Sequence, residues 1–455
     1  MQRSVRSIIA LQTAIAASAI ASHALATNGM DPVAFGAAPA GRGGADLAVA
    51  TDTSAMNTNP AGITQNKMRA DASISLLMPS LTLNDRAATP QGTMELNTDK
   101  AGESKLFPLI NVGFSTHVFD GLYAGLAFVT QGGMGAEFKG LNTFSDADPT
   151  TMSQPVPGQY DTYSQIMYLK LVPTLAWRFE NVAQDVDVSV GAGFNVGMSK
   201  MEFRHGGFAF PEQDGDGIYA PHSVEFSSDY AMGYAVRLGV LLQVADAVGF
   251  GVSYQTKAKL PYEGTATVDK QLDYDSKMDF AWPQEVGLGV SARPMKPLLL
   301  AADLRWIEWS DTMDTVTLKG NATGQAPPGY ESLTLPFQMR WRDQVVVAVG
   351  AEYSVIDDVA VRLGYNYGKS PVEPDGINPL FPAVSEHHFT LGAGARVVAG
   401  LGFDAAVEYS PRNTVSSNAQ NQMALQPGTT TPSGYSFDVA MSQLTLHLGA
   451  RYLFD

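Results

Sequence analysis

The stretch QLTLHLGARYLF, residues 443–454, alternates between two kinds of side chain, with Leu453 as the one exception. Leucines, an alanine and two aromatic residues occupy one face of this stretch. Polar, small or charged residues, among them His447 and Arg451, occupy the other face. A period of two predicts a β-strand. An apolar face with aromatics near its end, opposite a small or charged face, is typical of a strand with lipid on one side and an aqueous lumen on the other.

The same alternation recurs upstream, for example over 234–243, 359–368 and 388–397. A large soluble β-sandwich or solenoid also has alternating strands. The lengths of the connections between strands must therefore distinguish these folds from a membrane barrel. Short turns, such as 119–121 and 356–358, alternate with long polar connections near 84–106, 140–159, 205–222, 318–329, 370–383 and 412–433. Short turns on one side and long loops on the other are the mark of an outer-membrane barrel.

We therefore predict an all-β protein, a transmembrane antiparallel β-barrel of about fourteen strands spanning 69–455. The expected strands lie near 69–83, 107–119, 122–139, 160–178, 186–204, 223–243, 249–265, 271–292, 298–317, 330–354, 359–371, 384–398, 401–414 and 434–454.

The amino-acid composition excludes several kinds of ligand and binding partner. The 455-residue chain has no cysteine, so disulfides and cysteine-ligated zinc are excluded. Its net charge of −16 argues against nucleic acid. No cofactor and no metal site is expected.

The N-terminus predicts export. Arg3 and Arg6 precede an apolar stretch from Ile8 to about Ile20, and Ala24-Leu25-Ala26 supplies a small-x-small cleavage site. We interpret residues 1–26 as a signal peptide. The alternative is a membrane anchor, for which the apolar stretch is short.

Residues 27–68 lack strand alternation and are rich in Gly, Ala, Asn and Pro. They precede the first strand, and a barrel of fourteen strands has a lumen wide enough to hold them. We expect them to fold inward as a plug, the hatch. A disordered periplasmic tail is the alternative.

The motifs AGRGGA (residues 40–45) and TNPAG (residues 58–62) in this segment resemble the hatch of the FadL/TodX family of outer-membrane hydrophobic-compound transporters. Later motifs, in order, are similar to the late strands of that family: WRD at 341–343, VGAEY at 349–353, VRLGY at 361–365, SPV at 370–372 and EHH at 386–388. The chain departs from the usual barrel ending, because Asp455 follows the aromatic Phe454.

The resemblance implies passive uptake of hydrophobic compounds, long-chain fatty acids foremost, through a plugged barrel in the outer membrane. Aromatic hydrocarbons are the alternative substrate within the family. Release would run sideways through a gap made by a kinked strand. Gly132 and Gly133 are our candidates for that kink, since adjacent glycines in a strand mark a bulge. The alternative is that they only make room for the hatch.

Candidate gating residues lie in the hatch motifs. Asn59 and Pro60 are expected to form a rigid turn, because proline fixes φ and asparagine can bond its own backbone. The other candidates are Ala61, Gly43 and Gly44.

Charged residues on the lumen face are the candidates for binding a carboxylate. They are Arg237, Asp303, Arg305, Glu352, Arg362, Arg396, Asp404, Glu408, His447 and Arg451. Pairing of opposite charges across the lumen is one interpretation. The sharper hypothesis is that one arginine, among Arg237, Arg305, Arg362, Arg396 and Arg451, binds a substrate carboxylate bidentately.

Apolar residues near the loops offer a capture site. Residues 106–110, or Leu380 with Phe381, could form an external apolar groove. The alternative is that they begin lipid-facing strands.

Other function classes are weaker. A general diffusion porin would lack the N-terminal plug. An outer-membrane enzyme is not indicated, since no Ser/His/Asp constellation is evident and Gly-x-Ser-x-Gly is absent. A purely structural or adhesive barrel is a further alternative. The expected partners are a hydrophobic small molecule, membrane lipid, lipopolysaccharide and the barrel assembly machinery, with the chain a monomer.

Overall fold

The computed structural model describes residues 28–89, 92–103, 106–145, 156–209, 221–245, 247–418 and 435–454. The predicted signal peptide, residues 1–26, and Asp455 lie outside the described residues.

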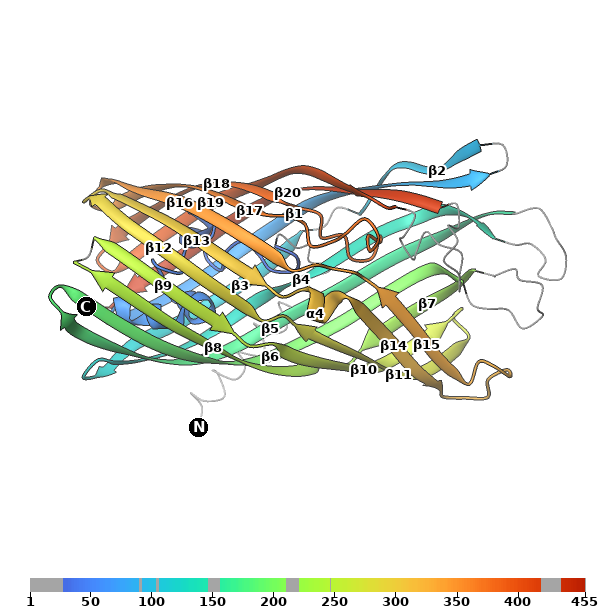
Figure 1. Ribbon diagram of the computed structural model, residues 1–455, viewed down its shortest axis with the longest axis horizontal. Coiled ribbons are helices and arrows are strands. Elements are labelled where there is room, and N and C mark those ends of the chain that lie inside the picture. Colours follow the sequence, from blue (N-terminus) through green and yellow to red (C-terminus); the bar gives the residue numbers. More distant parts are fainter. Residues whose placement is uncertain are drawn as a thin grey trace.

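The described strands form one closed antiparallel barrel of fourteen strands, as predicted (Figure 1). Closure is direct, because β1 pairs with β3 on one side and with β20 on the other. Around the barrel the strands are β1 (Met68–Thr89), β3 (Phe107–Phe119), β4 (Leu122–Ser145), β5 (Val156–Ala183), β6 (Val186–Ala209), β8 (Ala231–Val244), β9 (Val248–Gln255), β12 (Glu285–Met295), β13 (Leu298–Ile307), β16 (Gln344–Ile356), β17 (Val359–Gly368), β18 (His387–Val398), β19 (Leu401–Ser416) and β20 (Tyr435–Leu453).

Several strands continue toward the long loops after a break. The continuations are β7 (Pro221–Ser228), β10 (Ala258–Val268), β11 (Leu272–Trp282), β14 (Thr315–Ala322) and β15 (Ser332–Gln338), with α4 (Ser310–Met313) between β13 and β14. They pair with one another in the order β6, β7, β10, β11, β14, β15.

Residues 84–106 differ from the predicted long loop. Here β1 extends to Thr89 and pairs with the additional strand β2 (Gly92–Ala101), so the two form a hairpin. Polar side chains lie on both faces of this hairpin, so it lacks the apolar alternation by which the other strands were predicted.

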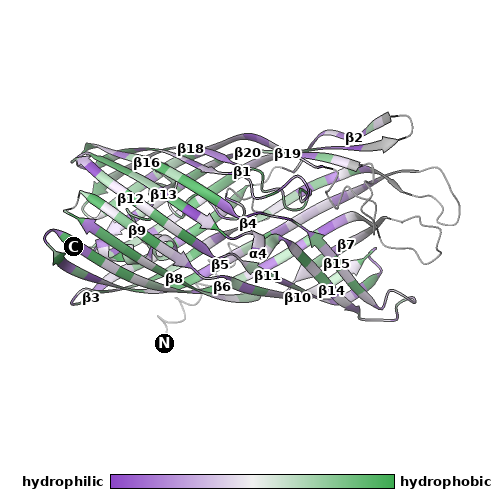
Figure 2. Cartoon of the chain, viewed as in Figure 1, coloured by the Kyte–Doolittle hydropathy of each residue, from purple (hydrophilic) through white to green (hydrophobic). Residues whose placement is uncertain are grey.

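The two faces of the wall agree with the predicted alternation. In β8, Tyr234 and Leu238 on the outer face are 58% and 49% exposed, whereas Arg237 on the inner face is 1% exposed. Hydrophobic and hydrophilic residues alternate along the strands in the half of the barrel that carries the short turns (Figure 2). This half is the part of the wall that faces lipid.

Residues 28–66, which we call the inner segment, lie inside that half of the barrel (Figure 1). They form α2 (Ala37–Gly41), α3 (Ala55–Thr58) and the 3-10 helix η1 (Pro60–Gln65). Helix α2 packs against β17 to β20, and η1 packs against β5, β6 and β8. Among the described residues, no helix has the length and apolar character needed to cross a membrane.

Residues 369–386 also differ from prediction, because they fold inward rather than forming an external loop. Trp341 forms an isolated bridge with Val372, and Asn413 donates to the carbonyl of Val384 at 2.7 Å. The segment therefore contacts Trp341, just after β15, and also β19. Among the described strands, β15 pairs only with β14, and residues 413–416 of β19 pair only with β20, so each has a free edge there. Leu380 and Phe381 are buried inside, so they form no external groove.

The other predicted groove, residues 106–110, is not external either. Leu106 is exposed, but Phe107 and Leu109 are buried and face inward. Successive residues of β3 face opposite sides of the wall, so Phe107 and Leu109 point into the lumen together.

Candidate functional site

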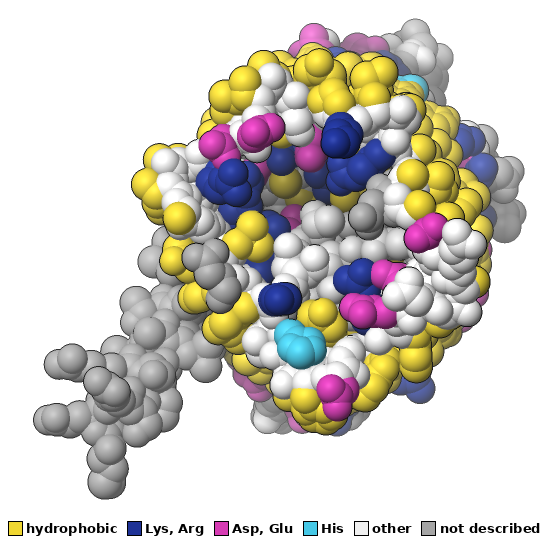
Figure 3. Space-filling model, turned by 90° about the vertical axis from the view of Figure 1, so that its left-hand side faces the viewer, with side chains coloured by type: hydrophobic (Ala, Val, Ile, Leu, Met, Phe, Trp, Pro, Cys, Tyr) yellow, Lys and Arg dark blue, Asp and Glu magenta, His cyan; other side chains and the backbone are white. Residues whose placement is uncertain are grey.

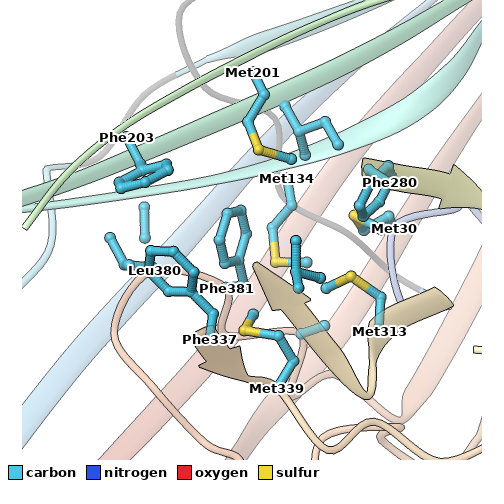
Figure 4. Packing of buried hydrophobic residues seen from close by; sticks show 14 of the residues in the cluster. Met30, Met134, Met201, Phe203, Phe280, Met313, Phe337, Met339, Leu380 and Phe381 are labelled. Atoms are coloured by element: carbon cyan, nitrogen blue, oxygen red, sulfur yellow. The ribbon is translucent and has the colours of Figure 1, made fainter. Parts of the chain in front are cut away.

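A small apolar cavity of about 20 Å³ lies in the lumen, where the tip of the inner segment meets the loop-side half of the barrel. All of its lining side chains are apolar. They are Met30, Ile166, Met201, Phe203, Met278, Phe280, Met313, Val316, Phe337, Met339 and Phe381. Figure 4 shows labelled members of this lining, among them Met201, Phe280 and Phe381, converging from several strands and from the inward segment 369–386.

Methionine and phenylalanine dominate this lining. Methionine has an unbranched, flexible and polarisable side chain, so it adapts to ligands of irregular shape and makes favourable contacts with aromatic rings. Phe203 and Phe337 already make an edge-on contact at 5.1 Å between ring centroids. The cavity is thus suited to apolar compounds rather than to polar solutes.

A row of aromatic rings belongs to the same buried apolar cluster as the cavity lining. Tyr168, Trp282, Trp309 and Trp341 are buried, with successive centroids 4.9, 6.1 and 5.3 Å apart. A Cβ on Gly29 would lie 2.5 Å from the Trp309 ring, so only glycine allows the inner segment to lie against this row.

The wall strand β4 bulges beside this row. Its pairing with β5 shifts register between Thr130 and Gly132, which leaves Gln131 as the extra residue. Gly132 has a φ of +153°, and a Cβ there would lie 2.1 Å from the carbonyl oxygen of Met30. Gly133 donates its backbone N–H to that same oxygen at 3.1 Å.

The ladder between β3 and β4 ends at the bulge. Its last register pair is Asn111 with Val129. At the next position the Thr130 hydroxyl donates to the carbonyl of Ile110 at 2.9 Å, so a side chain replaces the ladder there. Strand β4 therefore bulges next to the two glycines, and Gly132 lies against the inner segment. A role of this bulge as a lateral opening stays a prediction.

Gln131 connects the bulge to two parts of the inner segment. Its Nε2 donates to Asp31 Oδ1 at 2.6 Å, and Asn57 Nδ2 donates to its Oε1 at 2.9 Å. Trp282 Nε1 also donates to Asp31 Oδ1, at 3.1 Å. Burial, and next the nearby Glu285, raise the pKa of Asp31 to about 7.

Asn59 and Pro60 lie at the start of η1, and their role in gating stays a prediction. Asn59 caps η1, accepting from the backbone N–H of Ala61 at 3.3 Å, and Pro60 is the first residue of that helix. Asn59 Nδ2 also donates to the carbonyls of Leu47 at 2.8 Å and of Val240 in β8 at 3.0 Å. One side chain thus joins two parts of the inner segment and the wall.

Gly43 and Gly44 lie where the inner segment touches β17. Both have positive φ, +67° and +81°. A Cβ on Gly43 would lie 2.7 Å from the backbone nitrogen of Tyr365, and one on Gly44 would lie 2.2 Å from the carbonyl oxygen of Val33. Only glycine fits at either position.

A family model described as outer membrane protein transport protein (OMPP1/FadL/TodX) matches residues 11–454. The chain belongs to the FadL/TodX family. It is therefore an outer-membrane barrel of a family that transports hydrophobic compounds. No curated protein sequence matches the chain.

Solved structures agree on the fold. A Pseudomonas aeruginosa FadL homologue is 18% identical, with a TM-score of 0.69 over 94% of this chain and 100% of that one. The Ralstonia pickettii toluene transporter TbuX is 18% identical, with a TM-score of 0.63 over 93% and 99%. The Pseudomonas putida toluene transporter TodX is 16% identical, with a TM-score of 0.66 over 93% and 99%.

The arginines predicted for this FadL/TodX family member serve mainly to hold the inner segment or to pair with acids. Arg237 donates to the carbonyl of Thr58 at 3.0 Å and to Glu285 at 3.2 Å. Arg305 donates to the carbonyl of Gly44 at 3.0 Å.

The remaining three arginines lie nearer the short turns. Arg362 and Arg451 share Asp404, the first at 2.8 Å. Arg396 departs from the predicted lumen position, because it lies exposed at the rim and pairs with Asp358 in a short turn. Figure 3 shows Lys, Arg, Asp and Glu side chains around the hollow at this end, with hydrophobic side chains outside.

Two groups were not anticipated from the sequence. In the methionine-rich lining, alternation alone places Met201 and Met278 on the lumen face of their strands, but it does not show that they converge on one cavity. The second group crosses strands: Glu408 bonds His388 and His447, both at 3.1 Å, and His447 bonds Ser75 at 2.8 Å. Only the barrel's closure brings Ser75 to His447, which are 372 positions apart.

Proposed function

We propose that this chain takes hydrophobic compounds across the outer membrane by binding them in the apolar cavity and releasing them sideways at the β4 bulge. The observation that carries this proposal is that Met30 belongs to both features. Its side chain lines the cavity, and its carbonyl oxygen accepts from Gly133 in the bulge.

Capture needs only apolar walls. Transfer from water stabilises a bound chain by about 0.8 kcal/mol for each buried CH₂ group. The lining listed above offers such walls, and its methionines allow the space to adjust. Long-chain fatty acids and aromatic hydrocarbons both fall within this proposal.

Release follows from the same contact. A compound that displaces the Met30 side chain moves the backbone that Gly133 holds, and β4 then separates further from β3 beyond Val129. Such coupling requires the compound to bind the open arrangement better than the closed one. The inner segment, anchored by Asn59 and Arg237, acts as the hatch that returns the bulge to its closed state.

A reversible tether tests the coupling. Because the chain has no cysteine, Met30→Cys with Gly133→Cys introduces a single pair at backbone-bonded positions, where a disulfide can form. Uptake of a radiolabelled hydrophobic compound is measured in cells that make each variant. We expect oxidation to block uptake and reduction to restore it.

The control is Val361→Cys with Ala393→Cys, a register pair that joins β17 to β18 on the outer face. Its disulfide should leave uptake unchanged. Full uptake through a barrel whose 30–133 tether is complete would overturn the proposed release route. Free ion conduction by the untethered barrel in planar bilayers would favour a porin instead.

A further inference from the structure

We infer that the loop-side wall has a second opening, closed by the inward segment 369–386, through which hydrophobic compounds dissolved in the outer leaflet enter the lumen. This inference rests on the proposed function and adds to it the entry route and the phase that supplies the compound. The opening lies between β15 and β19, in a different part of the wall from the β4 bulge.

Two neighbouring strands stop short of the loop-side half of the wall. Strands β17 and β18 end there at Gly368 and His387, whereas β15 and β19 continue on either side. In Figure 1, β16, β17 and β18 lie in the half with the short turns, and β14 and β15 lie in the other half. The facing edges of β15 and of residues 413–416 have no strand partner among the described strands. The places of two strands are thus left unfilled.

Segment 369–386 fills this opening without becoming a strand. It makes no ladder with the described wall, and its strand-like contact is the isolated bridge between Val372 and Trp341. Buried apolar side chains, among them Ile377 and Leu380, hold it against the lumen cluster. Four residues have no N–H to give to a ladder: Pro371, Pro374, Pro379 and Pro382. A region held by packing rather than by a ladder opens more readily than paired strands do.

A hollow of about 520 Å³ lies on the outer side of this closure. Met313 and Met339 line the lumen cavity, whereas their sequence neighbours Asp314 and Arg340 line the hollow. The cavity and the hollow therefore lie on opposite sides of a wall one chain thick. The full lining of the hollow is Asp314, Thr315, Gln338, Arg340, Trp341, Arg342, Glu373 and Asp375.

The hollow adjoins the loop-side limit of the lipid-facing band. On the outer face of β16, Val345 and Val347 are 52% and 40% exposed. Just before them in the chain, Asp343 accepts from the indole N–H of Trp306 at 3.2 Å. A tryptophan with an apolar body and a bonded N–H is typical of the boundary between the hydrocarbon and polar zones of a membrane. Arg342, which lines the hollow, is next to Asp343, so the hollow lies at this boundary.

Lipid is the phase from which such an opening draws. An apolar compound concentrates in a bilayer, because removing its surface from water is favourable. A compound in the outer leaflet would reach the hollow without returning to water. Parting of Phe381 and Met339, which both line the cavity, would then admit it to the lumen.

Two ion pairs hold the exposed corner of the segment in place. Arg340 donates to Asp375 at 2.9 Å, and Arg342 pairs with Glu373. The two arginine side chains are 36% and 48% exposed, so water and salt weaken both pairs. The corner is therefore held reversibly, in keeping with a closure that opens and closes.

A reversible cross-link tests the route. Arg340→Cys with Asp375→Cys places two thiols in a chain that has no other cysteine, and a short bis-methanethiosulfonate reagent joins them. Uptake of radiolabelled toluene and 1-dodecanol, which partition into lipid, is measured in cells. We expect the cross-link to slow uptake by roughly fivefold or more, because the closure can no longer move, and reduction to restore it.

The matched control is Glu263→Cys with Lys277→Cys. These residues form an exposed ion pair at 2.6 Å on the outer face, but they belong to strands β10 and β11, which a ladder already joins. The same reagent should leave uptake through this variant unchanged. Unchanged uptake through a fully cross-linked 340–375 barrel, with uptake still blocked by the disulfide between positions 30 and 133, would overturn this inference and leave the proposed function intact. Unchanged uptake through both tethered barrels would overturn both.

A labelling measurement distinguishes lipid from external water as the source, and it needs no tether. Met339→Cys places a single thiol on the cavity side, and Gln338→Cys places one in the hollow. The full chain in lipid vesicles is treated with N-pyrenylmaleimide dissolved in the bilayer or with a charged, water-soluble maleimide. For each reagent, the labelling rate at position 339 is divided by the rate at position 338.

We expect the bilayer-dissolved reagent to give the higher ratio. Replacing both arginines of the ion pairs, Arg340→Gln with Arg342→Gln, should raise that ratio by roughly threefold or more, because the closure opens more often. Lys277→Gln, which removes an exposed ion pair elsewhere, should not change it. A higher ratio for the water-soluble reagent, or no response to loss of the two ion pairs, would overturn entry from the outer leaflet.

Discussion

The carbonyl oxygen of Met30 accepts a hydrogen bond from the backbone N–H of Gly133 at 3.1 Å, and thereby joins the inner segment to the wall. A wall strand normally gives such a donor to its neighbouring strand. Here the donor serves the inner segment because β4 bulges at Gln131 and its ladder with β3 has ended at Val129. The inner segment therefore supplies the hydrogen-bond acceptor for a backbone N–H that the bulge leaves without a strand partner.

This contact predicts a strict need for glycine at position 132. Gly132→Ala would bring a Cβ to 2.1 Å from the Met30 oxygen at a φ of +153°. We expect the inner segment to shift and the barrel to lose about 1–3 kcal/mol of stability, as in other overpacked sites. Protease cleavage within the inner segment should become faster. The control is Gly324→Ala, where a Cβ meets no atom within 4 Å; equal cleavage of the two variants would contradict the prediction.

Arg237 should anchor the inner segment more strongly than any exposed arginine. Arg237→Met leaves Glu285 buried without its cation and the Thr58 carbonyl without this donor, a loss of about 3–5 kcal/mol. We expect a lower unfolding temperature and increased ion conductance in planar bilayers. Arg396→Met removes only the exposed pair with Asp358, for which about 0–1 kcal/mol is expected. Similar conductance from both variants would argue against the anchoring role.

Asp31 should make docking of the inner segment depend on pH. Burial raises its pKa to about 7, with Glu285 adding to the shift and Gln131, Lys170 and Trp282 opposing it. An undocked aspartate titrates near 4, so the docked state holds the proton more tightly. Docking is therefore fully favoured below about pH 4 and weakens as pH rises to about 7, beyond which it stays constant.

Cleavage of the inner segment should accordingly be faster at pH 7.5 than at pH 5, after correction for the intrinsic pH dependence of the protease on a peptide substrate. Asp31→Asn removes the titration and should flatten this difference. A wild-type protein whose corrected cleavage rate does not change between these pH values would refute the linkage.

The strands of the wall could be predicted from the sequence because lipid requires apolar residues at every second position of each strand. Alternation predicted the outward position of Tyr234 and the inward position of Arg237 from neighbouring residues alone. The same local rule placed Arg396 in the lumen, but the wall ends near that residue, and an inward-facing position there is open to water. Strand parity gives the face of a residue and not its depth.

The cavity could not be predicted from alternation within single strands. Met30, Phe280 and Phe381 come from the inner segment, from β11 and from the inward segment 369–386, and only the closed barrel brings them together. The sequence of 369–386 is polar and contains several prolines, which predicted an external loop. Its apolar residues turn inward because β15 and β19 leave a space in the wall that they fill.

That inward fold predicts a direct role in binding for Phe381. Its side chain is 7% exposed and lines the cavity beside Phe337 and Met339. Phe381→Ala removes apolar surface worth about 1.5–3 kcal/mol to a ligand buried against it, which corresponds to roughly a 10- to 100-fold loss of affinity. The matched control is Phe403→Ala, on the lipid-facing side of β19 and 49% exposed, which should leave affinity unchanged. Titration calorimetry with an uncharged apolar probe measures both, and heat unfolding verifies the fold. Unchanged affinity in a folded Phe381→Ala barrel would mean that 369–386 seals the wall without contributing to the binding site.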